Sequence, residues 1–127
     1  RDQSVVPPKL RILAILIAAR ERQGAYVWAA QVNAARRAGI AEETIGKIRS
    51  RAQLSAYAPE EQEIIAYAEQ LMCANRIDQA TFDALKNRYG AAWLIELTTA
   101  MTYYAMLSNV VSAFEVAVPA DGDKLPS

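Results

Sequence analysis

Histidine is absent from this chain of 127 residues, and cysteine occurs only once, as Cys73. Without histidine the chain lacks the commonest general base, any Ser-His-Asp or Cys-His nucleophilic arrangement, and the usual zinc, copper and non-haem iron sites. A single cysteine cannot form an internal disulfide, which is typical of proteins in a reducing compartment such as the cytoplasm. We therefore expect a cytoplasmic protein with no metal site.

Glycine and proline are also scarce, with five of each, too few for a collagenous, low-complexity or turn-rich all-β chain. Fourteen basic residues balance fourteen acidic ones, so no overall field attracts nucleic acid or an anionic membrane. The sequence contains no glycine-rich phosphate loop, dinucleotide fingerprint or metal-spaced carboxylate motif, and it implies no cofactor. A hydrophobic fraction of 53% predicts one globular domain over residues 1–127, with enough apolar material for a single core.

Apolar residues recur at helical spacing along the chain, and no useful strand-like alternation occurs. The start signals include Pro59, which precedes two acids, and Asp78 as an N-cap. Gly24, Gly39 and Gly90 are interpreted as stops. These signals predict an all-α, six-helix bundle with helices over about residues 8–22, 25–38, 59–75, 79–90 and 91–117. The remaining, third helix is short, opens at residues 41–43 and carries Ile45 and Ile48 inward.

The last of these segments is the most apolar, because residues 97–114 contain no charge. That run is long enough to span a membrane, but threonine, serine, asparagine and tyrosine interrupt it and no basic cluster flanks it. We therefore favour a buried helix over a membrane span. A helix that is apolar all round must be covered on every side, either within the domain or by another subunit. Oligomerisation is expected on this ground.

Short motifs follow one another along the chain: LRILAIL at 10–16, YVW at 26–28, ARRAGIAEE at 35–43, YAPEE at 57–61, IEL at 95–97, and YYAML at 103–107 followed by Asn109. Their joint order and spacing, over about residues 9–118, resemble the carboxymuconolactone decarboxylase family, which also contains alkylhydroperoxidase-like proteins. The resemblance places the core of the domain at about residues 9–118. It implies a helical bundle assembled as trimers or hexamers, with pockets near the subunit contacts. It also implies one of two activities: cofactor-free decarboxylation or isomerisation of small lactone acids, or peroxide reduction by a Cys-x-x-Cys pair assisted by histidine and glutamate.

The chain departs from that family where the peroxidase residues stand. Ile12 occupies the glutamate position, Gly24 and Val27 the two cysteine positions, and Gln31 the histidine position. A thiol peroxidase needs a thiolate of low pKa and a resolving thiol, so this activity is not expected.

Three residues are the candidates for catalysis: Gln31, Tyr104 and Tyr26. Gln31 can hydrogen-bond a carbonyl or an enolate but cannot carry a proton near neutral pH; alternatively, it is a buried amide satisfied by the backbone. Each tyrosine hydroxyl can donate to a developing oxyanion or act as a general acid; alternatively, it belongs to the core or an interface.

The candidate substrate-binding residues are Val27, Trp28, Tyr103, Ile12 and Glu96, of which Val27 shares a helix face with Gln31. Together these residues predict a cofactor-independent enzyme that acts on a carbonyl, lactone or polyketide-like substrate by decarboxylation, isomerisation or cyclisation through an enol or enolate. The alternative is a non-catalytic family member that binds a ligand or stabilises an assembly. Its support is the joint replacement of the family's functional positions.

Overall fold

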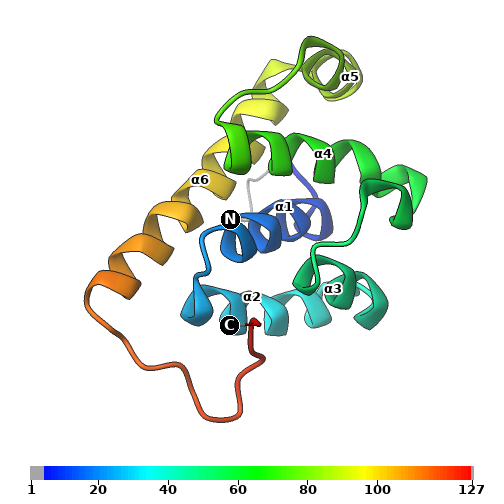
Figure 1. The fold of residues 1–127 in the computed structure, drawn as a ribbon. Coiled ribbons are helices and arrows are strands. Elements are labelled where there is room, and N and C mark those ends of the chain that lie inside the picture. The colour runs from blue at the N-terminus through cyan, green and yellow to red at the C-terminus, as the bar shows by residue number, and fades with distance from the viewer. Residues whose placement is uncertain (1–4, 127) are drawn as a thin grey trace.

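A computed structural model describes residues 5–126, which contain six α-helices and no strand, as the sequence predicts. The elements in chain order are α1 (Pro8–Glu21), α2 (Ala25–Arg37), α3 (Glu42–Arg49), the 3₁₀ turn η1 (Leu54–Ala56), α4 (Pro59–Ala74), α5 (Gln79–Tyr89) and α6 (Ala91–Ala113). The chain thus folds as an all-α bundle (Figure 1).

Helix α1 is the centre of the bundle. Its residues 12–19 are all buried, because the segment is apolar around most of its circumference. It packs against α4 on one side and against α2 on the other. Helix α6 also packs against α1 and runs obliquely past it (Figure 1). The largest fully buried side chains around it include Trp28, Ile65 and Leu97, from α2, α4 and α6.

Gly24 stands in the break between α1 and α2, as predicted, but it is not the residue that takes the left-handed conformation there. Gln23 takes the left-handed conformation after α1, with φ +52°, whereas Gly24 has an ordinary φ of −84°. Glycine is needed at position 24 because α6 lies too close: a Cβ there would stand 2.6 Å from the Cβ of Ser108. The other two predicted stops are confirmed, since Gly39 and Gly90 have φ of +88° and +92°.

Helix α6 ends at Ala113, four residues before its predicted end. The Glu115 N–H donates to the Ser112 carbonyl and the Val116 N–H to the Val111 carbonyl, while Glu115 is left-handed with φ +53°. This is a Schellman motif, which usually places glycine at the left-handed position. The apolar residues continue beyond Ala113, and hydrophobicity alone therefore overestimates the length of the helix.

Replacing Glu115 by glycine is expected to raise the free energy of unfolding by about 1 kcal/mol, because glycine adopts the left-handed conformation without strain. Urea denaturation followed by circular dichroism measures the change. The control is Glu115→Gln, which removes the charge from the helix end but keeps the strained backbone. An equal gain in both variants would assign the effect to charge rather than to the backbone.

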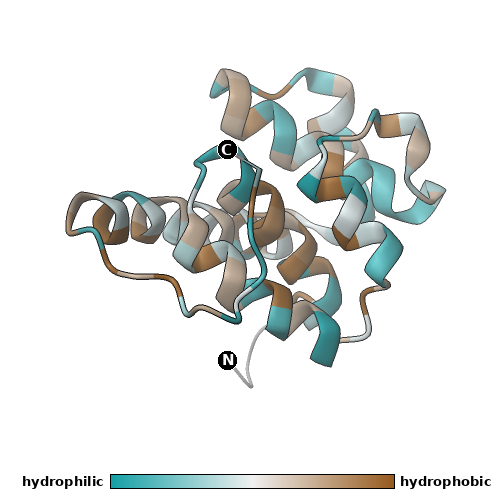
Figure 2. Cartoon of the chain, turned by 60° about the horizontal axis from the view of Figure 1, so that its bottom comes forward, coloured by the Kyte–Doolittle hydropathy of each residue, from teal (hydrophilic) through white to brown (hydrophobic). Residues whose placement is uncertain are grey.

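One face of α6 is left uncovered by the other described residues, although burial on every side was expected within the domain or against a subunit. Leu94, Leu97 and Met101 face the core, whereas Met106 is 54% exposed and Phe114 is 80% exposed. Figure 2 shows mostly pale and brown residues along the exposed end of this helix. None of the helices formed by residues 5–126 is long and apolar enough to cross a membrane.

The segment after α6 turns back across the bundle and ends beside α2 (Figure 1). Gly122 lies against Ala29 of α2, and Leu125 packs on the hydrophobic core. Packing therefore extends beyond residue 118, where the sequence places the end of the core.

Candidate functional site

A groove with a cavity volume of about 450 Å³ lies between α1, α2 and α6. Helix α1 contributes Arg11, Ile12 and Ile15, helix α2 contributes Gln31 and Ala34, and helix α6 contributes Glu96, Thr99, Ala100, Tyr103 and Tyr104. Five of the eight candidate residues meet here, from three helices: Gln31, Tyr104, Tyr103, Ile12 and Glu96. They meet because each lies on the face of its helix that lines the groove.

Two polar side chains in this groove have no partner within the described part of the chain. Gln31 and Tyr104 are both half-buried, and neither makes a side-chain hydrogen bond to another of residues 5–126. The ring of Tyr103 packs edge-on against that of Tyr104, with centroids 5.1 Å apart. The backbone does not satisfy the Gln31 amide, so this amide and the Tyr104 hydroxyl are available to a ligand.

The charged residues of the groove are tied to the segment before α1. An Arg11 guanidinium N–H donates to the Val6 carbonyl at 3.2 Å, and the Val5 N–H donates to a Glu96 carboxylate oxygen at 3.2 Å. One cation and one anion therefore stand on the wall, from α1 and α6 respectively.

The arrangement suits a small organic molecule with at least one oxygen. Isoleucine and alanine side chains form the apolar wall, and a few polar groups can set the orientation of a ligand, as in most small-molecule sites. An amide and a phenol pointing at one oxygen can stabilise negative charge that develops on it. Among the described residues that line the groove, only the tyrosines and Glu96 could transfer a proton.

The other three candidates lie elsewhere. Tyr26 and Val27 border a second cavity of about 210 Å³ at the start of α2. Trp28 borders neither cavity: it is fully buried, and its indole N–H donates to an Asp123 carboxylate oxygen at 2.9 Å. The guanidinium of Arg49 lies 5.9 Å from the centroid of its ring. These positions separate Tyr26, Val27 and Trp28 from the Gln31 amide.

Asp123 is the centre of a cluster that sequence reasoning missed. Its carboxylate accepts hydrogen bonds from Trp28 and from Arg49, and it lies 3.4 Å from Arg36. Arg36 also pairs with Glu42 at 2.6 Å, so it links Asp123 to the start of α3. Burial alone raises the pKa of Asp123, but the hydrogen bonds from Trp28 and Arg49 and the charges of both arginines outweigh burial and lower it. No local sequence pattern signals this cluster, because its members are far apart in the chain.

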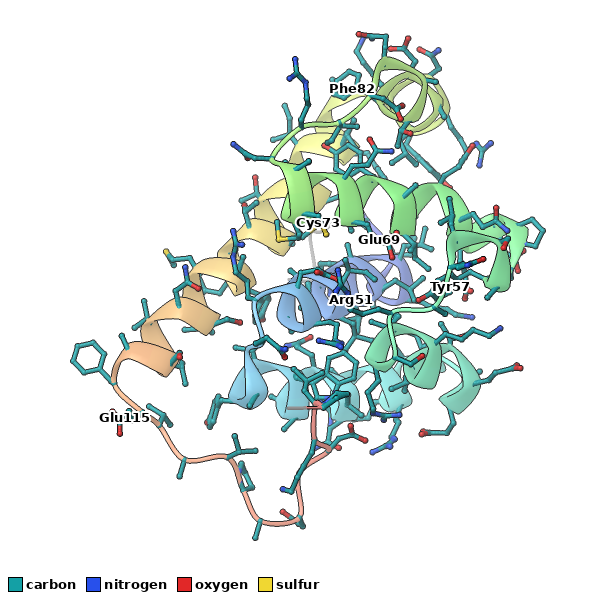
Figure 3. The ribbon with its side chains drawn as sticks, viewed as in Figure 1. Arg51, Tyr57, Glu69, Cys73, Phe82 and Glu115 are labelled. Carbon is teal, nitrogen blue, oxygen red and sulfur yellow. The ribbon has the colours of Figure 1, made fainter. Side chains whose placement is uncertain are left out.

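The only cysteine of the sequence, Cys73, is exposed on α4 (Figure 3). Partial burial of its sulfur raises the pKa of the thiol, and the neighbouring Glu21 carboxylate raises it further, against the opposing effect of Arg51. Reactive cysteines have a lowered pKa instead. The surroundings of Cys73 thus disfavour the thiolate that peroxide chemistry needs.

Comparison with known proteins gives one match. The model of the carboxymuconolactone decarboxylase family matches residues 2–70, just over half of the chain. The matched part contains α1, α2, α3 and most of α4, and hence the α1 and α2 walls of the groove. Searches of curated proteins and of solved structures find no match.

Proposed function

Because the chain belongs to the carboxymuconolactone decarboxylase family, we propose that it is a cofactor-independent enzyme acting on a small carbonyl, lactone or polyketide-like substrate. The reaction is a decarboxylation, isomerisation or cyclisation that passes through an enol or enolate. One observation carries this proposal: the Gln31 amide and the Tyr104 phenol, which have no hydrogen-bond partner among residues 5–126, border the same groove.

In this proposal Gln31 and Tyr104 hold the substrate oxygen on which negative charge develops. The Gln31 amide donates one hydrogen bond and the Tyr104 hydroxyl a second, in a site of low polarity where such bonds are strong. Ile12 and Tyr103 shape the cavity, and the Glu96 carboxylate is the groove's candidate base. Because Tyr26, Val27 and Trp28 lie outside this groove, they do not contact the reacting oxygen.

Thiol peroxidase activity is not part of the proposal. The two positions for redox cysteines hold Gly24 and Val27, and the surroundings of Cys73 raise its pKa. A dithiol reaction needs a second thiol to resolve the first, and the sequence contains none.

A homo-oligomer, trimeric or hexameric, is the proposed working form. The exposed apolar residues of α6 include Tyr103, which also borders the groove, so a second copy packed on this face would narrow the groove opening. Light scattering on the purified protein tests this directly. A mass of three or six chains supports the proposal, and a monomer at micromolar concentration contradicts it.

Turnover of a panel of lactones and β-keto acids, followed by NMR and by release of carbon dioxide, tests the enzymatic proposal. Tyr104→Phe and Gln31→Leu are each expected to lower kcat/KM about tenfold, since each removes one hydrogen bond to the developing charge. Tyr89→Phe is the matched control, because Tyr89 is exposed on α5 and stacks on Trp93 away from the groove. Undiminished turnover in both groove variants would refute the site.

The second candidate function is ligand binding without catalysis. Its support is that Ile12, Gly24, Val27 and Gln31 together replace the four residues on which peroxidase relatives depend. The two candidates differ in one result: saturable binding in the groove with no chemical change in any compound of the panel would favour the binding protein.

A further inference from the structure

The second cavity lies where the first turn of α2 meets the end of α6 and the segment that follows it. It has a volume of about 210 Å³ and is separate from the groove that contains Gln31. Its wall includes Gly24, Tyr26 and Val27 from one side and Ser108, Val111 and Val118 from the other.

The α2 end of this cavity offers unpaired backbone donors. Gly24 is the N-cap residue and has no side chain with which to cap the helix. The Ala25 N–H bonds to the Gln23 carbonyl, but the N–H groups of Tyr26 and Val27 have no acceptor within residues 5–126. Such N–H groups, together with the helix dipole, attract anionic oxygens.

Ser108 provides an independent sign of a ligand. It is only 2% exposed, and its hydroxyl has no hydrogen-bond partner among the described residues. A buried hydroxyl without a partner costs about 1–3 kcal/mol, so proteins rarely keep one without a function. The hydroxyl lies against Gly24, beside the place where a larger residue would carry its Cβ. Glycine at position 24 therefore brings the hydroxyl and the first turn of α2 to the same wall.

The rest of the wall consists of valines, one acidic residue and two polar side chains, those of Gln23 and Ser112. Val111, Val116 and Val118 supply hydrocarbon surface opposite the donors. Glu115, the only acidic residue on the wall, is exposed at the outer end of α6 and extends away from α2 (Figure 3). A ligand that fits has an anionic oxygen at one end and a short hydrocarbon tail at the other.

We propose that this second cavity binds the carboxylate of a short aliphatic acid. The N–H groups of Tyr26 and Val27 and the hydroxyl of Ser108 donate to the carboxylate, and the valines contact the tail. This binding does not depend on the proposed enzymatic activity in the groove.

An NMR titration of the ¹⁵N-labelled protein with butyrate, at constant ionic strength, tests the proposal. Saturable shifts are expected at the amide signals of Tyr26, Val27 and Ser108. Butyramide, which has the same shape but no charge, is expected to bind at least about tenfold more weakly, because bonds to charged acceptors are stronger.

The Ser108→Ala variant separates this site from a merely structural serine. It is expected to weaken butyrate binding about tenfold and, without ligand, to unfold at a higher urea concentration, since it removes the unpaired hydroxyl. Ser55→Ala, which removes an exposed hydroxyl in η1, is the matched control. It should change neither the affinity for butyrate nor the urea concentration at which the protein unfolds. Val118→Phe, which fills the cavity, should abolish binding in a folded protein.

Three results would each overturn the proposal: no saturable shift at the α2 amides, equal affinity for butyrate and butyramide, or unchanged affinity in Ser108→Ala. Because none of these measurements involves catalysis, a failure here leaves the function proposed for the groove untouched.

Discussion

Replacing Gly24 by alanine is expected to lower the free energy of unfolding by about 3 kcal/mol, a large overpacking effect. The new Cβ would lie 2.6 Å from the Cβ of Ser108 and closer still to its hydroxyl oxygen. Both atoms belong to segments that cannot easily move, since Gly24 caps α2 and Ser108 lies on the buried side of α6. The backbone at position 24 has a φ that alanine adopts freely, so only the steric contact opposes the substitution.

Rescue by a second substitution distinguishes this contact from a general sensitivity of the helix start. Ser108→Gly, which removes the Cβ, should restore much of the stability lost in Gly24→Ala, whereas Ser108→Ala, which keeps the Cβ, should restore little. Urea denaturation of the single and double variants gives the coupling energy, expected at about 1–3 kcal/mol for residues in contact. Equal effects of the two second substitutions would show that the Cβ contact is not the cause.

Replacing Asp123 by alanine is expected to cost about 2 kcal/mol of stability and to release the segment after α6 from α2. The substitution leaves the fully buried indole N–H of Trp28 without its acceptor, and it leaves Arg49 without its carboxylate. Denaturation measures the loss, and faster amide hydrogen exchange in residues 116–125 reports the release. Asp123→Asn keeps an acceptor for Trp28 but loses the charge, so its free energy of unfolding should lie between those of Asp123→Ala and the parent. Unchanged exchange in the alanine variant would contradict the anchoring role.

The same carboxylate predicts a dependence of stability on pH. The pKa of Asp123 is lower in the folded protein than its ordinary value of 3.8, so the folded state favours the charged form. The resulting stabilisation is complete above the unfolded-state pKa and is lost as pH falls through the lower folded-state pKa, that is, below about pH 4. The difference in stability between the parent and Asp123→Asn should therefore be constant near neutrality and shrink in acid.

Local signals in the sequence predict most of the fold. Pro59 is the first residue of α4, and Asp78 is the N-cap residue of α5. The Asp78 carboxylate accepts a hydrogen bond from the Thr81 N–H. The end of α6 could not be predicted, because Glu115 adopts a conformation that residue type disfavours. The role of Gly24 could not be predicted either, since it depends on a neighbour 84 positions along the chain.

The sequence predicts which residues of each helix share a face, and to that extent it predicts the site. Gln31 and Tyr104 were selected from separate helices, and the packing of α2 and α6 on α1 places both at one groove. Trp28, three positions from Gln31, turns instead toward the returning segment. In the sequence, Ser108 is only one of the polar residues that interrupt the uncharged run 97–114. Its missing partner is a property of packing in three dimensions, which no spacing rule reveals.

The bond between Trp28 and Asp123 joins residues 95 positions apart and has a consequence for the order of events during synthesis. Chains leave the ribosome from the N-terminus, so α1 and α2 emerge long before Asp123. Until then the Trp28 indole lacks its acceptor, and α1 lacks the cover that α6 provides. The bundle therefore cannot complete its native contacts before Asp123 has emerged from the ribosome, and meanwhile the apolar residues of α1 depend on chaperones or on transient contacts for protection.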